Sequence, residues 1–142
     1  MVSGYSIPPI ATALAMFSLG LFVLSRNIQS GVHRALFLQC LCHSVWLFTY
    51  GIMYSVDSAE VARSIVNIGY TAVIFIPVTF YHFIIHFLKI YSHKRWLVLS
   101  YITALGFAGT LWFSPYFVTE MTRYFWGFYH QEIGRASCRE RV

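Results

Sequence analysis

Three histidines offer the most varied chemistry in this chain. His82 and His86 are four residues apart, so a helix would place both on one face, about 6 Å apart along its axis. His43 lies about 10 Å from the start of one expected helix, and His82 lies about 9 Å from the end of the next, which gives both the same depth. Cys40 is near that depth too.

Two imidazoles at one depth on facing helices are typical of a haem or metal site. The same residues also fit two other interpretations, which the sequence leaves open. Histidines near a membrane surface can form hydrogen bonds across helices or reach the headgroups, and they can act as proton sensors. His43, His82 and His86 are therefore the candidate cofactor residues.

Enzyme chemistry is not expected within this chain. It has no glycine-rich phosphate loop, no CxxC pair and no nucleophile elbow. Asp57, Glu60 and Glu120 all fall in expected exterior loops. We therefore predict no catalytic residue, no metal site, no resident cofactor and no nucleic-acid partner.

The stretch that must position the histidines is 64–88, which contains no Asp, Glu, Lys or Arg. A helix of this length spans roughly 37 Å, which is enough to cross a bilayer with some tilt. Asn67, Thr71, His82 and His86 fall within an arc of about 100° on it. Pro77 removes one backbone donor and should kink the helix. Asn67, Thr71, Pro77 and His82 are therefore the candidate signalling residues, and we expect this polar stripe to face helix two or an absent helix rather than lipid.

The amino-acid composition is typical of a membrane protein. Of its 142 residues 58% are hydrophobic and only 11% are charged, against about one charged residue in four for a soluble domain. The uncharged stretches predict an all-α, polytopic membrane helical bundle with an outer loop over 114–131. Its four transmembrane helices are expected at about 8–25, 35–54, 64–88 and 96–113.

The last residues differ sharply from the rest. The segment 133–142 reads IGRASCRERV and holds three of the ten basic residues. It resembles the translation of a common sequencing adapter, so we interpret 132–142 as a non-native tail and 1–131 as the native membrane region.

Charge in the short loops predicts the orientation. Arg26 and Arg34 flank the first loop, and Lys89, Lys94 and Arg95 follow the third helix. The second loop has one arginine and two acids. By the positive-inside rule the N-terminus is expected outside.

The residue pattern also resembles a family. Helix two carries Phe37 and Trp46, and helix three carries Ile68-Gly69 and the run IPVTFYHF over 76–83; WGFYH follows at 126–130. Over about 14–131 this pattern is similar to the N-terminal seven-transmembrane region of bacterial sensor histidine kinases. The resemblance implies four helices of an expected seven and a signal-input role in a two-component system.

The resemblance implies a parent protein of the bacterial inner membrane. Its cytoplasmic output domain, a histidine kinase or in some members a diguanylate cyclase, lies outside this chain. The expected partners are the lipid bilayer, the absent helices, the output domain and a second copy in a homodimer. The alternative is a haem- or metal-binding redox membrane protein that uses His43 and His82.

Overall fold

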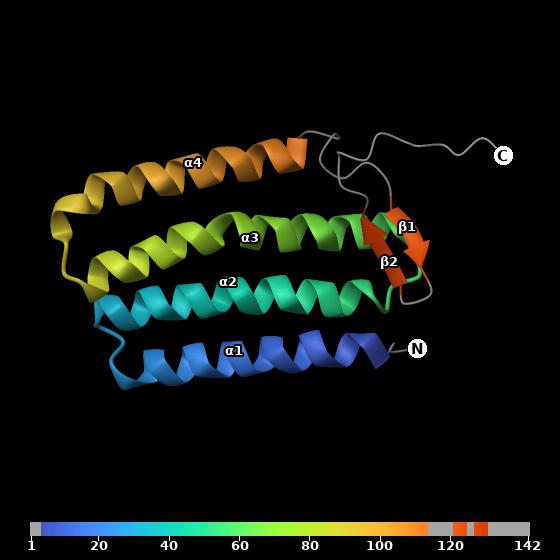
Figure 1. Ribbon diagram of the computed structural model, residues 1–142, viewed down its shortest axis with the longest axis horizontal. Helices are drawn as coiled ribbons and strands as arrows, with labels where there is room; N and C mark the ends of the chain where they lie inside the picture. Colours follow the sequence, from blue (N-terminus) through green and yellow to red (C-terminus); the bar gives the residue numbers. More distant parts are fainter. Residues whose placement is uncertain (1–3, 114–120, 125–126, 131–142) are drawn as a thin grey trace.

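The computed structural model describes residues 4–113, 121–124 and 127–130. Long helices dominate it, as Figure 1 shows. In chain order the elements are a short 3-10 turn η1 (Gly4–Ser6), α1 (Ile7–Arg26), α2 (Gly31–Met53), α3 (Ala59–Phe87), a second 3-10 turn η2 (Tyr91–His93), α4 (Lys94–Phe113), and the strands β1 (Met121–Tyr124) and β2 (Gly127–His130).

The predicted all-α polytopic architecture is confirmed. Four helical segments within the described ranges are long and apolar enough to cross a membrane, and each comprises one of α1 to α4. Continuous apolar sequence favours helices here, because a helix satisfies its own backbone groups where no water is present.

The helices extend beyond the predicted spans. Helix α2 begins at Gly31 rather than Ala35, and α3 begins at Ala59 rather than Ser64. The prediction was wrong at these ends because it stopped each helix at a charge. A charged residue marks where the hydrocarbon ends, whereas backbone hydrogen bonds continue through Glu60 and Arg63 into water.

The four helices lie side by side in one row (Figure 1). Helix α1 packs on α2, α2 on α3, and α3 on α4, and among the described residues α1 does not reach α3 or α4. The two broad faces of this layer therefore carry many exposed apolar side chains, such as Phe22, Phe80 and Leu105. Only α2 and α3 are flanked on both sides.

Small residues allow the helices of the row to approach closely. A Cβ atom added to Gly20 would lie 2.8 Å from the Cβ of Cys40, and one added to Gly69 would clash with Thr49. Ser44 donates a hydrogen bond of 2.8 Å to the Ala13 carbonyl, which ties α2 to α1. Such contacts replace the hydrophobic driving force that lipid does not provide between helices.

A buried apolar cluster lies at the α2–α3 corner and consists of Met53, Ala62 and Val66.

The hairpin formed by β1 and β2 contacts α2 and α3. Figure 1 places it beside the end of the row where these two helices are connected. It falls in the predicted outer loop 114–131, with β1 antiparallel to β2 and Tyr124 paired with Gly127. The interpreted adapter-derived tail, 132–142, lies outside the described residues.

Substitution of glycine tests the close packing. We expect Gly20→Ala to lower the free energy of unfolding by about 1–3 kcal/mol, because the new methyl group meets the Cβ of Cys40 rather than the end of a flexible side chain. The matched control is Gly106→Ala on α4, where an added Cβ has nothing within 4 Å. Unfolding in mixed micelles measures both, and equal stabilities of the two variants would contradict this account of α1–α2 packing.

Candidate functional site

Helix α3 carries the candidate site because it is the central helix that contains a proline. Pro77 lies within the continuous helix Ala59–Phe87. It cannot donate the hydrogen bond that would reach the carbonyl of Val73. The polar side chains of α3 divide between its two neighbours, α2 and α4.

Towards α2 the site is built on Thr79, which is 3% exposed. Its hydroxyl donates to Oε1 of Gln39 on α2 at 2.5 Å. The carbonyl oxygens of Phe75 and Ile76 in its own helix lie at 3.0 and 3.1 Å. A threonine hydroxyl has one proton, so these three acceptors compete for it.

His43 joins the same group from α2. Its Nδ1 lies 2.9 Å from the carbonyl oxygen of Gln39 and 3.5 Å from the Nε2 of that residue. Because a carbonyl can only accept, the shorter contact requires a proton on Nδ1. His43 is therefore held along its own helix, one turn from the residue that meets Thr79.

Towards α4 the contacts come from the predicted polar stripe. His82 Nδ1 lies 2.9 Å from the hydroxyl of Tyr101. Trp112 Nε1 donates to the hydroxyl of Thr71 at 3.0 Å, and that hydroxyl donates to the Asn67 carbonyl at 2.8 Å. Thr71 and His82 thus face α4 where helix two was expected, whereas His86 of the same stripe lies beside Gly31 of α2. A contact of the stripe with an absent helix stays a prediction.

Asn67 contributes its backbone to this chain of bonds but not its side-chain oxygen. Its Oδ1 is buried and has no hydrogen-bond partner within the described part of the chain. The hydroxyl of Thr79 meets the carbonyls of Phe75 and Ile76 rather than the one that Pro77 frees near Val73. A threonine two residues after the proline reaches back only three or four residues.

The structure brings two of the three candidate histidines together. The rings of His82 and His86 are 4.9 Å apart, and the His86 ring is 6.1 Å from Tyr91. His86 also fills the space beside Gly31, where a Cβ would clash with its imidazole.

His43 and His82 bond to different neighbours, Gln39 on α2 and Tyr101 on α4. Within the described part of the chain, no group of three or more His, Cys, Asp or Glu side chains converges to hold a metal ion. The haem or metal alternative at His43 and His82 stays a prediction, which a visible absorption spectrum of the extracted protein decides.

Sequence reasoning missed the Gln39–Thr79 pair as part of the site. Thr79 lies about 60° around the helix from His82, outside the predicted stripe. The available signal was its position: a hydroxyl in the turn that follows a proline has nearby carbonyls to bond.

Comparison with known proteins gives one match. The family model described as the N-terminal 7TM region of histidine kinase matches residues 8–135 of this chain. Neither a curated protein nor a solved structure matches this chain.

The Gln39–Thr79 bond can be measured with a double-mutant cycle. Thr79→Val keeps the shape but leaves Gln39 Oε1 unpaired, and we expect it to lower the free energy of unfolding by about 1–2 kcal/mol. The coupling between Thr79→Val and Gln39→Leu should be about 0.6 kcal/mol or more.

Thr103→Val is the matched control, because the Thr103 hydroxyl is exposed and donates only within α4, to the Leu99 carbonyl. A coupling energy of zero between positions 39 and 79 would show that the contact does not stabilise the α2–α3 pair.

Proposed function

Because this chain belongs to the family of N-terminal 7TM regions of histidine kinases, and so is a membrane sensor input region of a histidine kinase, we propose that it transmits a stimulus to a cytoplasmic output domain of a bacterial two-component system. The catalytic part of such a kinase is a separate region, so the role of this chain is to bias it. The stimulus would act on helix packing.

One observation carries this proposal: α3 is bonded through side chains to both of its neighbours, on both sides of its proline. Thr71 and His82 flank Pro77 and bond α4, whereas Thr79 bonds α2. A change in the bend at Pro77 must therefore alter contacts to α2 and α4 together. This makes α3 the element that can pass a displacement across the layer.

The hydroxyl of Thr79 supplies the two alternative states. In the present state it meets Gln39 of α2, and in the other it bonds only the carbonyls of its own helix at Phe75 and Ile76. The second state leaves Gln39 Oε1 without its partner, so it lies about 1–2 kcal/mol above the present state. A small differential affinity of a stimulus for one state then shifts the balance.

The remaining partners follow from the same role. We propose that the chain lies in the bacterial inner membrane with its N-terminus outside, and that further helices of the parent close the layer. The parent would act as a homodimer, as one subunit of a two-component kinase acts on another. The exposed apolar faces of α1 and α4 support packing against additional helices or lipid.

Pro77→Ala in the full-length parent tests the hinge. The substitution restores the backbone donor and should straighten α3, which shifts basal autophosphorylation in membrane vesicles severalfold. Thr79→Val should shift it as well, because it removes the bond to Gln39. Phe80→Leu on the exposed face of α3 is the control and should leave it unchanged. Normal membrane expression with unchanged signalling in both test variants would leave Pro77 as a static kink.

Protease protection tests the orientation. The α3–α4 connection contains Lys89 and should be protected from trypsin in spheroplasts, then cut once the membrane is opened. A specific protease site inserted in the α2–α3 connection, 54–58, should be cut in intact spheroplasts. The reverse pattern would place the N-terminus inside. The output domain of a seven-helix parent would then not lie in the cytoplasm, which contradicts the proposal.

A further inference from the structure

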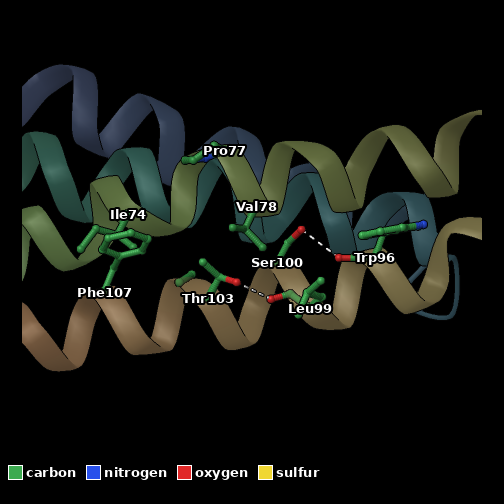
Figure 2. A pocket seen from close by; sticks show the side chains of 9 residues that line it. Ile74, Pro77, Val78, Trp96, Leu99, Ser100, Thr103 and Phe107 are labelled. Atoms are coloured by element: carbon green, nitrogen blue, oxygen red, sulfur yellow. Dashed lines mark hydrogen bonds between the residues drawn. The ribbon is translucent and has the colours of Figure 1, made fainter.

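An apolar groove runs between α3 and α4 at the level of the proline. It has a volume of about 340 Å³, and Figure 2 shows side chains of both helices around it. Pro77 and Val78 line it from α3, and Trp96, Leu99 and Phe107 line it from α4.

The few polar groups in the groove are already bonded. Ser100 donates to the Trp96 carbonyl and Thr103 to the Leu99 carbonyl, both at 2.9 Å (Figure 2). Both hydroxyls thus use their only proton within α4, so neither can donate to a polar ligand. The groove therefore fits a hydrocarbon chain.

The end of the groove marked by Trp96 is strongly basic. Lys94 and Arg95 directly precede Trp96 in the first turn of α4, and Arg95 lies one turn from Leu99 on the same side. Lys89 lies in the connection between α3 and α4, two residues after α3 ends at Phe87, with a left-handed φ of 57°. Both acidic residues within the described ranges, Asp57 and Glu60, lie at the opposite end of the row.

An anion bound near these cations would be electrostatically favourable. Positive side chains in the first turn of a helix are repelled by the positive end of its dipole, and the first turn of α4 contains no acid. On α3, Tyr81 lies one turn beyond Pro77 towards the basic end, where its hydroxyl lies 3.1 Å from His93 Nδ1. The groove thus has an apolar lining and ends beside polar and positively charged side chains.

We propose that this groove binds an acyl chain of an anionic phospholipid whose phosphate contacts Lys94 and Arg95. Basic pockets between transmembrane helices are suited to such headgroups. The same cations do not favour a lipid with a neutral headgroup, and a helix packed in the groove would need an acidic end to meet them. Charge thus selects the lipid, and the apolar groove holds its chain.

Native mass spectrometry of the purified chain with equimolar phosphatidylglycerol and phosphatidylcholine tests this. We expect retained phosphatidylglycerol to predominate, and Arg95→Gln and Lys94→Gln each to reduce its retention about fivefold. Arg26→Gln is the matched control, because Arg26 lies at the same end of the row but on α1, over the Phe22 ring. Equal retention of the two lipids, or an equal loss in Arg26→Gln, would overturn the proposal.

A second pair of variants tests the groove itself. Ser100→Leu adds volume inside it and should reduce phosphatidylglycerol retention, whereas Gly106→Leu adds volume where nothing lies within 4 Å and should not. Unchanged retention in Ser100→Leu would mean that only surface charge attracts the lipid, and would overturn the groove assignment. If the protein instead forms a dimer that Ser100→Leu dissociates, and if it shows no lipid preference, the groove binds a second copy of the chain. That result would also overturn the proposal.

Discussion

Hydrocarbon cannot form hydrogen bonds, and this constraint accounts for where most polar side chains within the helices lie, with the buried Asn67 Oδ1 as an exception. A hydroxyl, amide or imidazole inside a span must bond protein or remain unsatisfied at a cost of a few kcal/mol. Hydroxyls such as those of Ser100 and Thr103 bond a carbonyl of their own helix. The bonds that cross between helices are fewer, and those of α3 flank Pro77.

The single-row arrangement gives these crossing bonds their importance. In a closed bundle each helix is held by several other helices, whereas here the only long helices that contact α3 within the described residues are α2 and α4. Its position therefore depends on the two contact surfaces and on the side-chain bonds within them. The α2 side is close-packed, since Gly69 leaves no room beside Thr49. The α4 side contains the groove, so it has more freedom to move.

Much of this fold could be predicted from the sequence, because the membrane imposes a simple rule. Charge-free stretches long enough to cross a bilayer predict spans, and all four correspond to helices. The shared face of Thr71 and His82 also followed from helical period. Which neighbour that face meets could not be predicted, because rotation of α3 about its axis depends on packing at Gly69 and Thr79. The family resemblance is confirmed by the match over residues 8–135, whereas the roles of the individual site residues remain predictions.

The proline, the buried hydroxyl and the groove are connected by the geometry of one helical turn. Thr79 is 3% exposed and faces α2, whereas Pro77, two residues earlier and about 200° around the helix, is exposed and lines the groove on the α4 side. If α3 bends at Pro77 as proposed, a bend that closes the groove would move Thr79 away from Gln39, and a bend that opens it would press Thr79 against α2. Whatever occupies the groove acts on the same displacement as the Thr79 bond. Lipid composition and the proposed stimulus would thus act on one equilibrium, and their effects on its free energy would add.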